Sequence, residues 1–256
     1  MIRNVSKDLF QIGNCVAGAG GHEAVQVYVI LNDGHPIIID CGSHLHRLEL
    51  MQELDTLLRD DIPEYVFLTH SELPHSGNLQ KIAGKWPAIK VFVSNVLLPY
   101  IELAPILPLE QITTVSSGAV LEFGGRTLEF VSALLRDQPG SQWIFDPQTG
   151  TLFTGDGFGY YHLAGSCHKF SDEIAGGVRE EQFRAYHYNA FKFLRWVVPE
   201  RMNEDLDKMI RQHAVKIIAP IHGSAIRADI PIHLERVKQA ISNICADFRS
   251  GEIDGH

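Results

Sequence analysis

Metal-binding residue types are concentrated in the segment FLTHSELPHSGNLQKI, which covers residues 67–82. His70 ends a β-rich run, and Glu72 follows two positions later, on the same side if the chain stays extended. His75 begins the next helical pattern and can turn back toward them. A set of imidazoles and carboxylates without thiolate suits iron, manganese or zinc, and additional carboxylates favour iron or manganese. The segment therefore predicts part of a metal site.

Further metal-binding residue types follow other β-rich runs. Asp156 follows the run TLFTG, and His222 follows KIIAPI, where Gly223 permits a close backbone approach. Asp40 ends the run IIID and is predicted to orient a ligand from behind. One histidine at a strand end would be weak evidence, but three histidines and three acids share this placement. Because loops at strand ends project side chains into a shared cleft, we expect one pocket, in which Asp156 can bridge two cations.

The elements that position these residues alternate between β-rich runs and helical patterns. Residues 24–31 and 36–42 flank Asn-Asp-Gly, a hairpin turn signal, and are predicted to form an antiparallel pair. Further strands are expected at residues 64–70, 90–95, 113–123, 127–134, 142–146, 151–156 and 216–220, and helices at 46–59, 75–86, 180–196, 203–213 and 232–248. The pattern predicts an α/β fold with two sheets covered by helices, built as one domain over residues 1–256.

Composition and charge exclude several classes of protein. The 256 residues are 45% apolar, which is ample for a buried core. The net charge of −9, without a cluster of Lys and Arg, argues against a nucleic-acid partner. No apolar run reaches the roughly 18 residues that span a membrane, and the N-terminal residues are too polar for a signal peptide. We therefore expect a cytoplasmic protein without a membrane partner.

The cysteines and the remaining histidines are assigned no ligand role at this stage. Cys15, Cys41, Cys167 and Cys245 are far apart and form no CxxC pair, so buried free thiols are predicted. No base lies beside Cys41 in the sequence, so it is not predicted to be a nucleophile. Surface or hydrogen-bonded core positions are predicted for His22, His44, His46, His162, His168, His187 and His213.

Three segments carry a resemblance to a known superfamily. The segments THSELPHSGN, LFTGDGFG and IIAPIHG resemble the metallo-β-lactamase superfamily, whose loop pattern HxHxDH is followed by a histidine, an aspartate and a last histidine. HxE in place of HxH, together with TGDGFGYYHLAG, REEQFRAYHYNAFKF and APIHGSAIR, resembles the diiron domain of flavodiiron proteins. The likeness extends from about Asp8 to Ile230. It implies a four-layer αββα sandwich with a dinuclear site at one edge.

Carrying this resemblance over residue by residue implies a ligand set with two departures from the family pattern. The implied metal ligands are His70, Glu72, His75, Asp137, Asp156 and His222. Pro74 stands where the family has the aspartate of HxExDH, and Asp137 stands where it has a histidine. One metal would keep His70, Glu72 and Asp156, with Asp137 as the candidate for a fourth ligand. The other, sharing Asp156, would be one ligand short. Water or His162 could complete it, and Tyr160 or Tyr161 could donate a hydrogen bond to a bound ligand.

The resemblance implies a cytoplasmic homodimer that holds two metal ions, with iron favoured and zinc or manganese as alternatives. Such a protein binds, and can reduce, dioxygen or nitric oxide. Because the sequence ends at His256 and nothing resembles a flavin site, electrons are expected from a separate protein. Two alternatives stay open: a metal-dependent hydrolase of an ester, lactone or thioester, and a sensor or interaction module with a degenerate site. The hydrolase reading depends on the acid that is absent at Pro74.

Overall fold

Two β-sheets lie face to face in the computed structural model, which describes residues 1–18, 21–97 and 107–250. The larger sheet has the sequential order β1 (Ile2–Ser6), β2 (Leu9–Gly18), β3 (Gly21–Ile30), β4 (Ile37–Ile39), β5 (Tyr65–Phe67), β6 (Lys90–Ser94) and β7 (Ile112–Val115). The smaller sheet has the order β12 (Ile217–Pro220), β11 (Thr151–Gly155), β10 (Gln142–Asp146), β9 (Arg126–Ser132) and β8 (Val120–Phe123). The two-sheet core expected from the sequence is therefore present.

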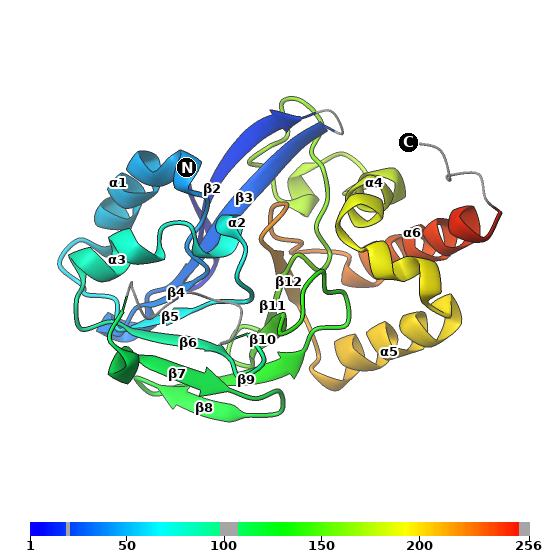
Figure 1. Cartoon of the computed structure of the whole chain (residues 1–256). Coiled ribbons are helices and arrows are strands. Elements are labelled where there is room, and N and C mark those ends of the chain that lie inside the picture. Colours follow the sequence, from blue (N-terminus) through cyan, green and yellow to red (C-terminus); the bar gives the residue numbers. More distant parts are fainter. Residues whose placement is uncertain (19–20, 98–106, 251–256) are drawn as a thin grey trace.

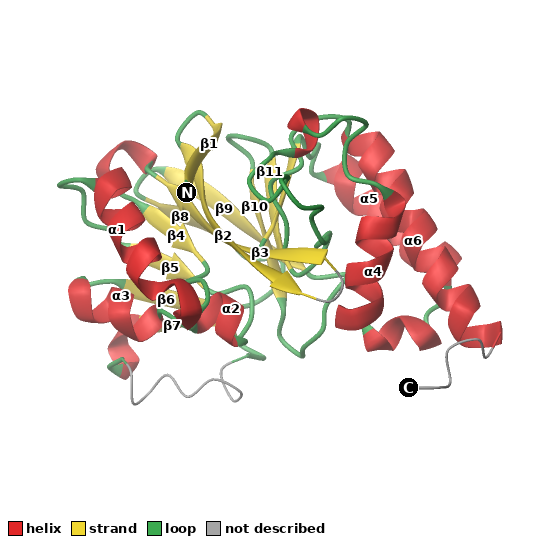
Figure 2. Ribbon diagram, turned by 90° about the horizontal axis from the view of Figure 1, so that it is seen from above, coloured by secondary structure: helices red, strands yellow, loops and turns green. Residues whose placement is uncertain are grey.

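Helices cover the outer face of each sheet (Figures 1 and 2). The helices are α1 (Arg47–Leu58), α2 (Leu73–Ser76), α3 (Leu79–Lys85), α4 (Glu180–Ala190), α5 (Pro199–Gln212) and α6 (Ile230–Ser250). The first three lie beside the larger sheet and the last three beside the smaller one. None of the helices in the described part of the chain combines the length and apolar character needed to cross a membrane.

Three apolar clusters hold the layers together. Leu54 of α1 and Ile82 of α3 pack with the outward-facing side chains of the larger sheet. An aromatic group that includes Phe67 and Phe123 fills the space between the sheets, and these two rings meet edge to face at 4.9 Å. Trp143 of the smaller sheet packs with the helices on its outer face. These clusters confirm the expected αββα sandwich.

The parallel strand pairs explain why the polar loops meet. β4 pairs with β5, and β11 pairs with β12, in parallel register. The carboxyl ends of parallel strands lie at the same edge of a sheet. Asp40 directly follows β4, Asp156 directly follows β11, and His70 and His222 come shortly after β5 and β12. One edge of the sandwich therefore collects the residues with metal-binding chemistry.

Three of the differences between the structure and the sequence prediction concern the sheets and α4. Residues 113–123 form two strands in different sheets, because the chain turns between them at Gly118, where φ is +89°. The helix predicted over 180–196 ends at Ala190 and gives way to a 3₁₀ turn, Lys192–Trp196. The pair β1 and β2 was not predicted, although it forms one edge of the larger sheet.

Candidate metal centre

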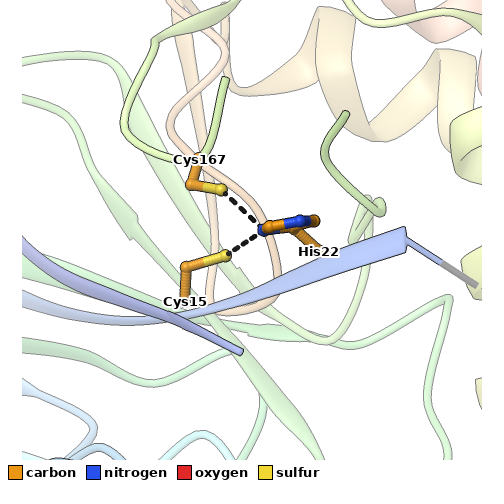
Figure 3. A group of neighbouring side chains, drawn as sticks. All are labelled: Cys15, His22 and Cys167. Atoms are coloured by element: carbon orange, nitrogen blue, oxygen red, sulfur yellow. Dashed lines mark hydrogen bonds between the residues drawn. The ribbon is translucent and has the colours of Figure 1, made fainter. Parts of the chain in front are cut away.

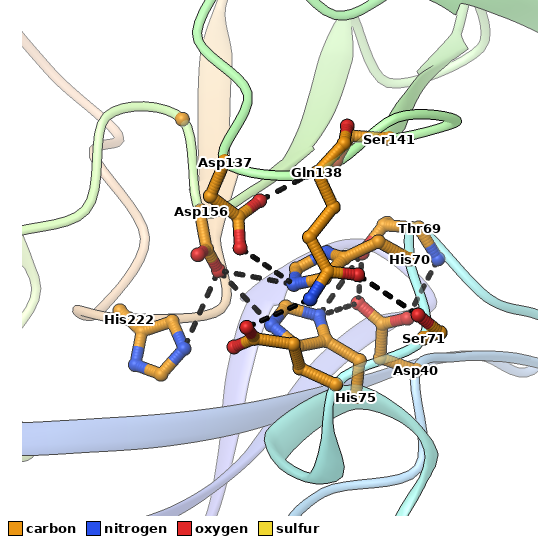
Figure 4. Close-up of polar contacts among 12 residues, drawn as sticks. Asp40, Thr69, His70, Ser71, His75, Asp137, Gln138, Ser141, Asp156 and His222 are labelled. Atoms are coloured by element: carbon orange, nitrogen blue, oxygen red, sulfur yellow. Dashed lines mark hydrogen bonds and ion pairs between the residues drawn. The ribbon is translucent and has the colours of Figure 1, made fainter. Parts of the chain in front are cut away.

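A buried carboxylate lies at the centre of the polar edge. The Oδ1 atom of Asp156 lies 3.0 Å from Nε2 of His75, 3.4 Å from Nε2 of His222 and 3.8 Å from Nε2 of His70 (Figure 4). The four residues come from three loops that are far apart in the sequence, and each is at most 6% exposed. Three imidazole nitrogens thus converge on one oxygen.

Several of these atoms have no hydrogen-bond partner among the described residues. They are Nε2 of His70, Nε2 of His75 and Oδ1 of Asp156. Burying a polar atom without a partner costs free energy, so native proteins rarely leave such atoms unsatisfied. A divalent cation would satisfy all three at once, and imidazole nitrogen and carboxylate oxygen are suitable donors. The residues present therefore fit a metal ion.

One group of donors joins His70 to three carboxylates, and we call it the first side. His70, Glu72, Asp137 and Asp156 each offer one atom, and these atoms lie within 4.8 Å of one another. The Oδ2 atom of Asp137 is 3.7 Å from Nε2 of His70. Gln138 donates from Nε2 to Oε1 of Glu72 at 2.8 Å, which holds that exposed carboxylate at the rim. This side brings together all four residues that the resemblance implies for one metal.

The imidazoles of His75 and His222 make up what we call the second side, which has fewer donors. His75 and His222 face Asp156 there, and the wall of the pocket includes Pro74. A prolyl ring has no donor atom, and Pro74 lies in the first turn of α2, where proline is well tolerated. Within the described residues, this side therefore offers two imidazoles and the shared carboxylate.

Two acids lie behind the imidazoles of the second side. Oδ2 of Asp40 is 2.9 Å from Nδ1 of His75, and its two oxygens also accept hydrogen bonds from the backbone N–H and the hydroxyl of Thr69. Oε1 of Glu23 is 2.7 Å from Nδ1 of His222. A carboxylate at Nδ1 fixes the ring and leaves Nε2 directed at the centre, as is common for metal-bound histidines. Asp40 therefore contacts a candidate ligand, as its position in the sequence suggested.

The charges around Asp156 favour its ionised form. Burial alone would raise the pKa of Asp156, but the imidazoles of His70, His222 and His75 outweigh burial and hold the pKa well below its ordinary range. Burial, with a smaller contribution from His75, lowers the pKa of His70 to about 3, so this ring is neutral and can act as a ligand.

Asp137 and His75 shift in the opposite direction. Burial and the nearby carboxylates of Asp156 and Glu72 raise the pKa of Asp137 to about 6. For His75, burial acts to lower the pKa, but Asp40 and Asp156 outweigh it and raise the pKa to about 10. Crowded carboxylates and a protonated imidazole are the pattern expected where a cation is needed to balance negative charge.

The centre opens into a pocket of about 500 Å³. Tyr186 of α4 lines this pocket, and its ring stacks on that of His222 at 5.3 Å. The ring approaches Gly159 so closely that a Cβ there would come within 2.4 Å of it, which only glycine permits. Burial and the negative charge of Asp156 raise the pKa of Tyr186 well above its ordinary value. Tyr186 therefore stays protonated and faces the pocket as a hydrogen-bond donor.

Two residues expected near the metal ligands lie elsewhere. The hydroxyl of Tyr160 donates to the carbonyl of Ser224 and accepts from its N–H, both at 3.0 Å, so it is not free to bind a ligand. His162 pairs through its backbone with His22 and is not among the residues that line the pocket, which leaves water as the other option for the second side. Tyr161 does line the pocket, and its hydroxyl accepts a hydrogen bond from Asn189.

Sequence reasoning missed Glu23, Gln138 and Tyr186. Glu23 begins a β-rich run and Tyr186 lies within a helix, so neither occupies the strand-end position that marked the other residues. Gln138 directly follows Asp137, and that adjacency was the only available signal.

The fold and the site together define a metallo-β-lactamase-type protein whose pocket contains residues that fit a metal ion. The model described as "ODP family beta lactamase" matches residues 24–223, and the chain belongs to this family. The resemblance to the metallo-β-lactamase superfamily and to flavodiiron proteins is confirmed.

Curated relatives match a part of their own length. The coenzyme F420H(2) oxidase of Methanocaldococcus jannaschii is 30% identical over 162 residues, which cover 62% of this chain and 38% of the relative. The anaerobic nitric oxide reductase flavorubredoxin of Aeromonas hydrophila is 24% identical, over 78% of this chain and 40% of the relative. The chain thus spans less than half the length of these relatives.

Solved structures share the fold. Rubredoxin oxygen:oxidoreductase from Desulfovibrio gigas superposes with a TM-score of 0.74 at 18% identity, covering 97% of this chain and 62% of that one. A flavodiiron core from Synechocystis superposes with a TM-score of 0.75 at 19% identity, covering 94% of this chain and 60% of that one. These similarities establish the sandwich architecture.

Proposed function

We propose that this chain is a flavodiiron-like, non-haem diiron protein that binds and reduces dioxygen or nitric oxide. The observation that carries the proposal is the convergence of three imidazole nitrogens on Oδ1 of Asp156, with further carboxylates on one side. The names of the relatives, an F420H(2) oxidase and a nitric oxide reductase, support this class of substrate.

The proposed ligands divide into two sets that share Asp156. His70, Glu72 and Asp137 would hold the first metal, and His75 and His222 would hold the second. When bound, a pair of ferrous ions supplies electrons and open positions for a diatomic molecule. The carboxylate-rich donor set favours iron, with zinc and manganese as the competing ions.

The other residues of the pocket orient the ligands and supply protons. Asp40 and Glu23 keep Nε2 of His75 and of His222 directed at Asp156. Tyr186, which stays protonated beside the centre, can donate a hydrogen bond or a proton to a bound oxygen or nitrogen atom. Tyr186 thus takes the hydrogen-bonding role that the sequence suggested for Tyr160, whose hydroxyl is paired with Ser224.

Reduction of either substrate consumes electrons and protons. We propose that a separate protein delivers the electrons and that solvent resupplies protons through the pocket. Assembly as a homodimer and a cytoplasmic location remain predictions from the resemblance.

A second candidate is a sensing or interaction module, and Pro74 favours it, because this position lines the pocket without offering a donor. Such a module would bind metal at the first side only and would not turn over.

One experiment separates these functions. Protein purified without oxygen and loaded with Fe²⁺ is assayed for iron per chain and, with a chemical reductant, for consumption of dioxygen and of nitric oxide. The proposal predicts about two irons and continuous consumption, both lost in Asp156→Ala. One iron without consumption supports the module. Preference for zinc, with hydrolysis of an ester, lactone or thioester, would show the hydrolase instead.

A further inference from the structure

A second group of metal-binding side chains lies outside the centre. Cys15 is on β2, His22 is on β3, and Cys167 is on the loop between β11 and α4 (Figure 3). In the register of the two strands, Ala17 is opposite His22 and Cys15 is opposite Ala24, so Cys15 and His22 are diagonal neighbours on one face. Cys167 reaches the same place from 145 residues away.

The distances within this group are those of ligands around one ion. Nδ1 of His22 lies 3.7 Å from Sγ of Cys15 and 3.2 Å from Sγ of Cys167, and all three atoms lie within 4.8 Å of one another. Tetrahedral zinc has Zn–S bonds of about 2.3 Å and Zn–N bonds of about 2.0–2.1 Å, which places its sulfur and nitrogen ligands about 3.6 Å apart. The observed distances lie on either side of that value.

Hydrogen bonding alone satisfies this arrangement poorly. A ring nitrogen carries either one hydrogen or one lone pair, so Nδ1 of His22 can make one good hydrogen bond and not two. Both thiols nevertheless point at it (Figure 3). A cation bound by all three atoms would satisfy them together.

We propose that Cys15, His22 and Cys167 form a second metal site, which takes a soft, thiophilic cation such as Zn²⁺ and leaves its fourth position to water. Two thiolates and one imidazole select such ions over the harder ones that suit the carboxylate-rich centre. All three residues are half-buried, so a cation can reach them from solvent. The site does not depend on the proposed diiron function.

A reactive thiol explains the cluster less well. Burial and the neighbouring thiol of Cys167 raise the pKa of Cys15 to about 12, whereas reactive cysteines have lowered pKa values. The prediction of four buried free thiols also holds only for Cys41 and Cys245, because Cys15 and Cys167 are half-buried.

The proposed cation would brace an edge of the main centre. His22 and His162 already join the β2–β3 hairpin to the loop through two backbone hydrogen bonds, of 3.0 and 2.7 Å. Glu23, the next residue along β3, points to the opposite face and contacts His222. A cation held by Cys15, His22 and Cys167 would therefore fix the strand that carries Glu23.

Cobalt titration of the reduced protein tests the proposal. Only thiolate ligands give sulfur-to-cobalt charge-transfer absorption, so binding at the carboxylate and imidazole centre does not interfere. We expect this absorption to level off at the intensity of one thiolate-bound Co²⁺ per chain, to disappear on adding Zn²⁺, and to be lost in Cys15→Ser and Cys167→Ser. The matched control, Cys245→Ser, should keep it.

Zinc affinity, measured by competition with a chromophoric chelator in the Asp156→Ala background, where the main centre is expected to bind no metal, gives a second readout. It should fall in Cys15→Ser by more than the roughly 10- to 100-fold that loss of an outer partner costs. His22→Gln should lower it as well, and this variant serves if a serine variant fails to fold by circular dichroism. Absence of the absorption in the reduced wild-type chain, or its persistence in both serine variants, would overturn the proposal. A Cys15–Cys167 disulfide whose reduction restores no cobalt binding would do the same.

Discussion

The two sides of Asp156 obtain their negative charge in different ways. On the first side, Glu72 and Asp137 themselves offer donor atoms beside Asp156, and burial together with the crowding of these carboxylates raises the pKa of Asp137. On the second side, Asp40 and Glu23 stand behind the imidazoles of His75 and His222 and act through them. The first side is thus rich in direct donors, and the second depends on positioned ligands. Asp40 and Glu23 therefore supply negative charge to the second side even though position 74 carries no acid.

The largest effect is expected where the two sides meet. Asp156→Ala should reduce iron from about two per chain to nearly none, because one carboxylate serves both ions. Metal analysis of anaerobically purified protein measures this. Asp205→Ala, an exposed acid on α5, is the matched control and should keep both irons. Unchanged iron in Asp156→Ala would show that the residue bridges nothing.

The next effect distinguishes the sides. His222→Ala leaves the second side with one imidazole and the shared carboxylate, so iron should fall to about one per chain. Asp137→Ala leaves three donors on the first side and should lower iron content less. Equal losses in the two variants would contradict the asymmetry.

Restoring an acid should strengthen the poorer side. Pro74→Asp should tighten the second metal roughly 10- to 100-fold, because affinity follows the number of charged ligands. Titration with Fe²⁺ under anaerobic conditions measures the weaker of two binding steps. If that step does not change, the side chain at position 74 does not reach the metal.

Removing the charge behind an imidazole should act more weakly. Glu23→Gln should weaken the second metal about 10-fold and leave the first unaffected, as for other outer partners of a metal-bound histidine. Glu122→Gln, at an exposed position of β8, provides the control. An equal effect on both metals would place Glu23 outside the second side.

The smallest effect on metal is expected at a buried imidazole that faces neither side. His187 is fully buried and neither ring nitrogen has a partner among the described residues, and burial lowers its pKa from 6.5 to about 3. Below pH 6.5, the imidazole of His187 therefore binds a proton in the unfolded chain but not in the folded chain. As a result, the free energy of unfolding decreases as the pH falls from 6.5 toward 3.

His187→Phe should remove that dependence. Its free energy of unfolding should fall less steeply than that of the wild type, with a slope difference that grows toward about 1.4 kcal/mol per pH unit as the pH falls below 6.5, and with iron content unchanged. Denaturant unfolding at pH 7, 6 and 5 measures the slopes. Loss of iron in this variant would mean that His187 belongs to the centre.

The two-sheet core and most of the candidate ligands could be predicted from local signals, whereas the αββα order and Asp137 came from the resemblance. Buried strands read as apolar runs, and parallel strands bring their ends to one edge, where His70, Asp156 and His222 lie. Glu23 and Tyr186 were missed because their roles depend on contacts between segments far apart in the chain. The cluster of Cys15, His22 and Cys167 was also missed, because its residues are far apart in the sequence and form no CxxC motif.

The central claim is that Asp156 lies between two metal ions held by different donors. Crystals of anaerobically reconstituted protein, measured at the iron absorption edge, test it most directly through anomalous diffraction. The account predicts two iron peaks flanking the Asp156 carboxylate, one beside His70, Glu72 and Asp137 and the other beside His75 and His222. A single peak, or two peaks on the same side of Asp156, would contradict it.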